Sequence, residues 1–241
     1  MANLDLERRA EIGAAKRART REQVIEAALR LVLHRAPEVP SLEDFVSAAG
    51  VARGTFYNHF RTKELLLKEA SAFVADAIDA EILPLCKGIE DPARRVSIAM
   101  RRFIDLARER PQWGWMLVHA QPQSGAGWSE GMRRGVLADI RAGHRSGRFR
   151  VSSVQAAAAL GVGALANAIR TTLTERTKED FSRQMAAMTL QALGIGAEEA
   201  CRIVTIPLPT SDAATDSHKS IRVGRRKSAT TRVESRRIAA A

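Results

Sequence analysis

Apolar side chains recur at intervals of three and four residues along most of this chain, the spacing that places them on one side of an α-helix. Val24, Ala28, Leu31 and Val32 follow this spacing, and Pro37 ends the segment. The same pattern predicts helices over residues 63–85, 91–110, 112–120, 129–144, 177–193 and 197–204, another beginning at residue 153, and a loop at residues 121–127. The low aromatic content, 5%, also favours helices over strands. We therefore expect an all-α fold.

Residues 41–60 are predicted to form two short helices joined by a tight turn. Ser41 suits the N-cap of the first helix, and Gly50 can take the left-handed conformation that ends it. The second helix has Phe56 and Phe60 on its apolar side. Two short helices joined in this way are typical of the helix-turn-helix, which places its second helix in the major groove of DNA.

The other side chains of this second helix are polar and point outward. They offer hydrogen-bond donors for base edges and phosphates, and none is acidic. They are Arg53, Thr55, Tyr57, Asn58 and His59, with Lys63 just beyond. These side chains suit either a DNA-contacting face or an ordinary solvated helix face.

Residues from about 20 to 67 resemble the DNA-binding domain of the TetR family of bacterial transcriptional regulators. The resemblance rests on V-I-E-A-A-L-R-L-V-L, the turn A-A-G-V, the string G-T-F-Y-N-H-F and the following T-K-E-L-L. It implies a three-helix DNA-binding head at residues 20–67 and a larger helical-bundle body at residues 68–206 that binds an effector and dimerises. The chain departs from the family at Ala52, where a capping Ser or Thr is usual, and at residues 37–41, which are stiffer than the usual Gly-containing segment.

The resemblance also implies that some residues of the head contact bases and others contact phosphates. Arg53 and Asn58 lie at the positions that read bases. Arginine suits guanine O6 and N7, and asparagine suits adenine N6 and N7. Phosphate contacts are expected from Thr55, Tyr57, His59 and Lys63, with Ser41 adding a contact at a helix N-terminus.

The body contains aromatic and polarisable side chains that suit the wall of a pocket for an apolar or amphipathic effector. The candidates are Phe103, Trp113, Trp115, Met116 and His119. Trp115 and His119, at i and i+4, are the favoured pair because both have a polar tip. For any one of these residues taken alone, ordinary core packing is the favoured interpretation.

Small residues, which let helices approach closely, are frequent between residues 153 and 193. They are residues 156–159, Gly161, Gly163, Ala164 and Ala168. By analogy with the family, we interpret these helices as part of a four-helix dimer interface. Tight packing inside one subunit is the alternative.

The formal charge of +11 indicates a polyanionic partner, but the excess lies beside the head rather than in it. Residues 1–21 have six basic and three acidic side chains and residues 207–241 have eight and three, whereas residues 22–67 have five and six. We interpret residues 1–19 as a flexible or partly helical basic arm, which either follows DNA phosphates or is a solvated tail. Residues 207–241 are interpreted as a disordered basic tail.

Several classes of function lack support in the sequence. No apolar run approaches the ~20 residues that cross a bilayer, so we expect a cytoplasmic protein without a membrane partner. Cys86 and Cys201 lack metal or redox spacing and are expected to be free thiols. With no metal-binding motif and no Gly-rich phosphate loop, we expect no metal, no cofactor and no enzymatic activity.

The predicted function is that of a sequence-specific transcriptional regulator that binds double-stranded DNA. The resemblance implies a homodimer on an inverted-repeat operator, acting as a repressor that a small-molecule effector releases. Coupling between effector and DNA would pass through the helix at residues 63–85. The alternative is an architectural or cell-division DNA-binding factor controlled by a protein partner.

Overall fold

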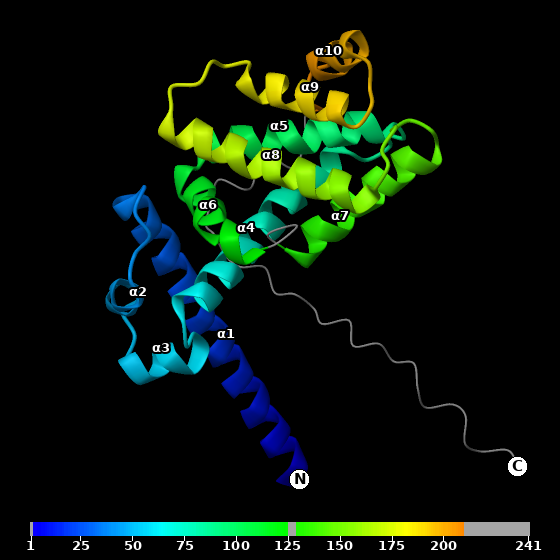
Figure 1. The fold of residues 1–241 in the computed structure, drawn as a ribbon. Coiled ribbons are helices and arrows are strands. Elements are labelled where there is room, and N and C mark those ends of the chain that lie inside the picture. Colours follow the sequence, from blue (N-terminus) through cyan, green and yellow to red (C-terminus); the bar gives the residue numbers. More distant parts are fainter. Residues whose placement is uncertain (1, 125–128, 210–241) are drawn as a thin grey trace, which may run out of the picture. The chain divides into compact units, whose positions relative to one another are not determined.

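The computed structural model describes residues 2–124 and 129–209 (Figure 1). All the regular structure in these residues is α-helical, which confirms the all-α prediction. The helices are α1 (Ala2–Arg35), α2 (Leu42–Ala49), α3 (Arg53–His59), α4 (Lys63–Leu85), α5 (Pro92–Glu109), α6 (Pro111–Ser124), α7 (Glu130–Arg145), α8 (Val154–Thr174), α9 (Phe181–Ala192) and α10 (Ala197–Thr205). Most of the predicted basic tail, residues 210–241, lies outside the described residues.

Helices α1, α2 and α3 and the start of α4 form a three-helix head. Helix α1 packs against α2 and α4, and α2 packs against α3. The core of the head consists of fully buried side chains from each of these helices. They include Val32, Phe45, Phe56, Phe60 and Leu66. Burial of each such side chain stabilises the fold by about 1.5–3 kcal/mol, so these residues hold the short helices in place.

The beginning and end of α2 follow the sequence pattern. The Ser41 hydroxyl accepts a hydrogen bond from the Asp44 backbone N–H at 3.2 Å, and the Asp44 carboxylate accepts one from the Ser41 backbone N–H at 2.9 Å. Gly50, with φ of 64°, ends the helix in the left-handed conformation. By contrast, Ala52 makes no side-chain cap for α3. Helix α3 is therefore held mainly by the packing of its two phenylalanines.

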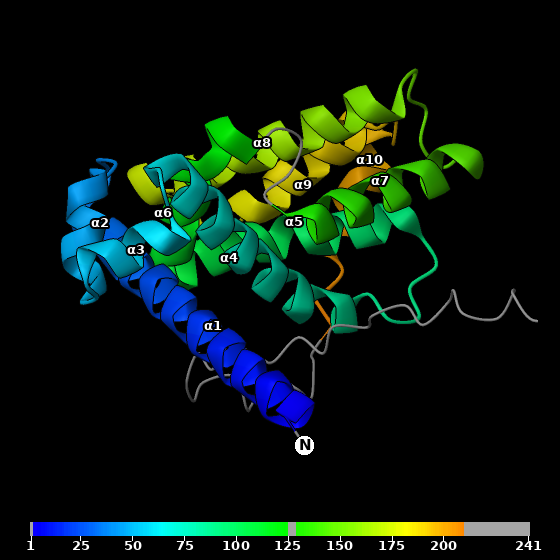
Figure 2. The ribbon, with the colours of Figure 1, turned by 90° about the horizontal axis from the view of Figure 1, so that it is seen from below.

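The body comprises α4 to α10. Helix α5 packs against α6, α8 and α9, α4 packs against α6, and α10 packs against α9. Figures 1 and 2 show α5, α8 and α9 side by side, with α4 leading from α3 into the body. One continuous cluster of buried apolar residues extends from α1 and α4 into α5, α6 and α8. The head and the body therefore share a core.

Helix α8 is, among the described residues, the one helix whose length and apolar content would suffice to cross a bilayer. It packs against α5, α6, α7 and α9. An apolar helix with partners on several sides is typical of the interior of a helical bundle.

Helix α1 is much longer than the apolar pattern predicts. It runs unbroken from Ala2, whereas apolar spacing begins only near residue 20. Residues 2–19 are rich in Ala, Arg and Glu and contain no proline, which favours helix without a packing partner. The described side chains of this segment are exposed or half-exposed, so no apolar periodicity is needed there.

Two other helix boundaries differ from expectation. Helix α6 continues to Ser124, into the segment expected to be a loop. Helix α9 begins at Phe181 rather than Thr177, and the residues before it contact Arg108 of α5. Its guanidinium donates to the Thr177 hydroxyl at 3.1 Å and to the Lys178 carbonyl at 3.4 Å.

Candidate nucleic-acid interface

The packing of α3 decides which of its side chains face solvent. Phe56 and Phe60 are fully buried, with ring centroids 6.2 Å apart. Because both lie on the core side of the helix, Arg53 and Asn58 are exposed. Helix α3 thus presents the polar side chains of Arg53 and Asn58 to solvent while its opposite side is fixed to the head.

Arg53 has defined neighbours on α2 and α3. Its guanidinium lies 3.7 Å from the Glu43 carboxylate of α2 and 5.5 Å from the centre of the Tyr57 ring. The Tyr57 hydroxyl is 3.5 Å from Nη2 of Arg53. Tyr57 in turn packs edge-on against Phe56 at 5.9 Å. A weak, exposed ion pair and an aromatic ring therefore hold Arg53 near the exposed surface of α3.

The expected phosphate-contacting residues are brought to the same part of the head. Thr55, Tyr57 and His59 of α3 and Lys63 at the start of α4 are half-buried. Thr62, whose hydroxyl accepts the Leu65 backbone N–H at 3.2 Å, caps α4 and so positions Lys63. Half-buried donors beside an exposed pair suit a surface that follows a phosphate backbone.

Ser41 differs from the other expected contacts. Its backbone N–H donates to the Asp44 carboxylate at 2.9 Å, and its hydroxyl donates to the same carboxylate at 2.8 Å. These two bonds, first the one from the side chain and then the one from the backbone, lower the pKa of Asp44. Both donors of Ser41 are therefore engaged within the protein, where they stabilise the start of α2.

Glu43 is a site residue that the sequence pattern did not identify. The outward set of α3 contains no acid, but Glu43 of α2 brings one to within ion-pair distance of Arg53. Only the crossing of α2 over α3 creates this contact, and helical spacing within either segment gives no sign of it.

Helix α1 is fastened to the rest of the head at two points. Gln23 donates from its side-chain amide to the Ala49 carbonyl at 3.2 Å, next to the turn between α2 and α3. Arg21 forms an ion pair with Glu69 of α4. These contacts fix the direction in which the N-terminal part of α1 leaves the head.

The five expected effector-site residues are all buried, and they fall into two groups. Residues two apart on an α-helix point about 200° apart, so Trp115 and His119 lie on a different side of α6 from Trp113. The Trp115 and His119 rings stack at 5.5 Å. Burial, and secondly the charge of Arg170, lowers the pKa of His119 and favours its neutral form.

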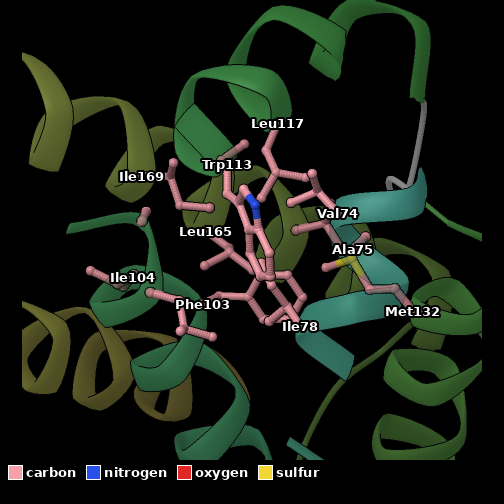
Figure 3. Packing of buried hydrophobic residues seen from close by; sticks show 14 of the residues in the cluster. Val74, Ala75, Ile78, Phe103, Ile104, Trp113, Leu117, Met132, Leu165 and Ile169 are labelled. Carbon is pink, nitrogen blue, oxygen red and sulfur yellow. The ribbon is translucent and has the colours of Figure 1, made fainter. Parts of the chain in front are cut away.

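The second group lies in the core between α4, α5, α6 and α8. Figure 3 shows the Trp113 indole among Phe103, Leu117 and Ile169, with Ile78 and Val74 of α4 close by. Met116 is also fully buried. The structure thus brings Phe103 and Trp113 together and places the favoured Trp115–His119 pair elsewhere on α6.

Trp113 is connected to α4 through a charged side chain. The Arg110 guanidinium lies over the Trp113 ring at 4.4 Å and contacts Glu81 of α4 at 2.5 Å. Arg102 of α5 is 3.6 Å from the same carboxylate. Aromatic packing in the body and the position of α4 are therefore linked by direct contacts.

The small residues of α8 divide between the interior and the surface. Ala157, Ala158 and Ala168 are buried within the subunit, whereas Ala156, Ala159 and Gly163 are exposed. Two large apolar side chains accompany the exposed ones: Leu160 of α8 is 53% exposed and Met188 of α9 is 65% exposed. Packing inside the subunit thus accounts for the buried part of the set, and the exposed part leaves apolar side chains on the surface of α8 and α9.

No group of three or more potential metal-ligating side chains occurs within residues 2–124 and 129–209. In the same residues, Cys86 is half-buried and Cys201 is exposed, and both are free thiols.

Two parts of the chain match sequence models of known domains. Residues 24–70 match the model for bacterial regulatory proteins of the tetR family, and residues 91–205 match the model for the tetracyclin repressor-like C-terminal domain. The first match covers the helix-turn-helix, and the second covers the body from α5 to α10.

Similar proteins support the same assignment. An uncharacterised HTH-type transcriptional regulator of Mycobacterium tuberculosis is 26% identical over 112 residues, which is 45% of this chain and 55% of that protein. The chain thus spans about half the length of the curated relatives it matches.

Solved structures match over more of the chain. The structure of RolR with resorcinol has a TM-score of 0.63 and 27% identity, covering 82% of this chain and 98% of that one. A TetR-family regulator from Syntrophomonas wolfei has the same fold, with a TM-score of 0.60, 17% identity, and coverage of 74% of this chain and 96% of that one. Together with the two domain matches, these likenesses show that the chain belongs to the TetR family of bacterial regulatory proteins.

Proposed function

We propose that the protein is a transcriptional regulator that recognises an inverted-repeat operator through α3. The observation that carries this proposal is the two-sided surface of α3, with Phe56 and Phe60 buried and Arg53 and Asn58 exposed. An arginine can donate two hydrogen bonds to guanine, and an asparagine can pair with adenine in the major groove. Arg53 and Asn58 are accordingly the residues that read bases.

The half-buried donors around this pair bind phosphates. Thr55, Tyr57, His59 and Lys63 set the register of α3 on the duplex without selecting a sequence. The donors of Ser41 are held by Asp44, so its contribution is to keep the start of α2 in place. The ion pair with Glu43 keeps Arg53 near the exposed side of α3, and when DNA binds, Arg53 leaves Glu43 and contacts a guanine.

The active form is a homodimer. One α3 reads too few base pairs to be selective, and a second copy of α3 in the next major groove, about 34–36 Å away, doubles the contact. The exposed apolar surface formed by Leu160, Met188 and the small residues of α8 supports this proposal. Pairing α8 and α9 with their copies would bury that surface.

The effector is a small aromatic or amphipathic molecule. RolR, which resembles this chain over most of its length, was solved with resorcinol. By analogy, the effector binds in the layer around Phe103 and Trp113, where aromatic side chains favour offset stacking. The Trp115–His119 stack, with its polar tips, is the second place for it.

Release of DNA follows from contacts between this layer and α4. An effector that displaces Trp113 also disturbs Arg110, whose guanidinium covers the indole and contacts Glu81 of α4. Because α4 follows α3 directly in the chain, a shift of α4 changes the position of the reading helix. The effector thereby favours a state of the dimer whose α3 spacing does not fit the operator, and the repressor leaves DNA. We place this activity in the cytoplasm.

The test is selection of fragmented genomic DNA by the purified protein, followed by sequencing. Enrichment of a few sites that share an inverted repeat would support the proposal. No enrichment over input DNA would contradict it, and enrichment of many dispersed sites would favour an architectural factor instead.

A further inference from the structure

The N-terminal part of α1 is a helical extension of the head with few contacts of its own. Figures 1 and 2 show it extending away from the other labelled helices. Within residues 8–20, the side chains described are exposed or half-exposed. The helix continues without a break into residues 24–32, which are anchored in the core, so its direction is fixed by the head.

One side of this extension is basic. Arg8, Lys16 and Arg19, here called the basic stripe, precede Gln23 by 15, 7 and 4 residues. Side chains at these intervals lie on the same side of an α-helix. The acidic residue of this segment whose side chain is described, Glu11, is about 120° around the helix from Gln23 and lies at the edge of the basic stripe, three positions from Arg8.

The orientation of the basic stripe follows from Gln23. The Gln23 amide donates to the Ala49 carbonyl at the turn that leads into α3. The side of α1 that faces this turn therefore carries the basic stripe in the residues that precede it. Arg19 is about 6 Å along the helix axis from Gln23, and Arg8 is about 22 Å from it, at 1.5 Å per residue.

We propose that the basic stripe binds phosphates of double-stranded DNA that flanks the sequence read by α3. This inference rests on the proposed function, because it uses α3 to place the duplex beside the turn at Ala49. Cations spaced along a rigid helix complement the regular negative charge of the duplex. The extension contacts up to about 6 bp beyond each half-site, since ~22 Å corresponds to that length at 3.4 Å per base pair.

The first test removes the charges of the basic stripe. The variant Arg8→Gln/Lys16→Gln/Arg19→Gln and the wild type are titrated with a duplex of random sequence over a series of salt concentrations. We expect the slope of log Kobs against log salt to become shallower by about 2.7 per bound chain, at 0.9 per phosphate contact. The matched control, Arg141→Gln/Arg145→Gln/Arg202→Gln, removes three exposed charges of the body and should leave the slope unchanged.

The second test keeps every charge and changes the geometry. Ala14 is exposed, and proline there removes a helical hydrogen bond and clashes with the preceding turn. Ala14→Pro should therefore shorten the hydroxyl-radical footprint on an operator duplex from genomic selection by several base pairs, as should the charge variant. Circular dichroism checks that α3 and the body remain folded.

The outcomes separate this inference from the function on which it rests. If the wild type selects no operator, the proposed function fails, and the salt slopes still decide whether the basic stripe contacts DNA. An unchanged slope in the charge variant, or a wild-type footprint no longer than the sequence read by α3, would overturn the inference.

Discussion

Arg53 and Lys63 differ in what they can contact on DNA. Arg53 is exposed on α3, where its guanidinium can reach the edge of a guanine, whereas Lys63 is half-buried at the start of α4. Arg53→Ala should lose about 1–3 kcal/mol of operator affinity and relax base preference near one position. Lys63→Ala should weaken binding to all sequences alike and reduce the salt slope by about 1.

The measurement is binding of both variants to a library of single-base operator variants. A loss that depends on the base for Arg53→Ala, and that is uniform for Lys63→Ala, is the expected pair of results. If the two affinity profiles were parallel, the division between base-reading and phosphate-binding residues would be wrong.

Glu43 should restrain non-specific binding. Its carboxylate lies 3.7 Å from Arg53 and would be repelled by phosphates. Glu43→Gln should therefore increase affinity for a duplex of random sequence at low salt. Competition binding in the wild-type and Arg53→Ala backgrounds measures this effect. We expect a smaller gain in the second background, and equal gains would show that Glu43 does not act through Arg53.

At the residue scale, the sequence predicts which side chains of α3 are exposed better than it predicts their neighbours. The outward residues of α3 follow from helical spacing once Phe56 and Phe60 are placed inside. The Glu43–Arg53 contact does not follow, because it depends on how two helices cross. In the body, spacing along α6 separates Trp113 from Trp115, but which of them meets Phe103 depends on the packing of four helices.

Within helix α7, two glycines should respond in opposite ways to alanine. A Cβ at Gly143 would lie 2.1 Å from the buried Phe149 ring, whereas a Cβ at Gly135 meets nothing within 4 Å. Gly143→Ala should lower the free energy of unfolding by about 1–3 kcal/mol, because the added methyl group overpacks the contact with Phe149. Gly135→Ala should raise it by about 0.5–1 kcal/mol, because alanine is the better helix former. Urea denaturation measures both, and two losses of similar size would contradict the account of the contact between Gly143 and Phe149.

Asp79 of α4 makes the stability of the protein depend on pH. Burial, and secondly the charge of Asp76, raises the pKa of Asp79 from 3.8 to about 6. The folded state binds the Asp79 proton more tightly than the unfolded state does. Protonation of Asp79 therefore stabilises the folded state; this contribution is complete below about pH 4 and is lost as pH rises through about 6. Asp79→Asn should therefore increase the free energy of unfolding at pH 7 and flatten its dependence between pH 4 and 6. Urea denaturation across that range measures it, with the exposed Glu179→Gln as control, and an unchanged pH profile would count against this cause.

At the scale of helices, where a helix begins and ends is harder to predict than whether the helix forms. Apolar periodicity identifies α4, α5 and α9 because each has a packed side. The same signal misses the first 18 residues of α1, which form a helix through local propensity alone. The residues just before α9 contact Arg108 of α5, about 70 positions away in the chain, and spacing within the segment gives no sign of that contact.

For the whole molecule, the exposed apolar surface of α8 and α9 should decide the oligomeric state. Leu160→Glu/Met188→Glu places charges where two copies would meet, so it should shift the dimer to monomers and abolish operator binding. Leu83→Glu changes a side chain that is 70% exposed on α4 and should leave the dimer intact. Sedimentation at micromolar concentration measures both. A double variant that stays dimeric would place the interface elsewhere.

The sequence predicts the arrangement of the whole molecule through family resemblance more than through pattern. The match of residues 24–70 implies the helix-turn-helix head. The apolar sides of α4 and α6, which are buried in the structure, indicate that a helical body is attached to it. Whether small residues of α8 face inside or outside cannot be read from their composition. Ala156 is exposed and Ala157, its neighbour in the chain, is buried.

The central claim is that α3 of each subunit in a symmetric dimer reads the same bases in one half of an operator. Its most direct test compares the DNA motifs selected from a random library by the wild type and by Arg53→Gln/Asn58→Gln. The account predicts an inverted repeat for the wild type and, for the variant, altered or lost preference at symmetric positions in both halves. An unchanged motif in the variant, or an asymmetric motif for the wild type, would contradict it.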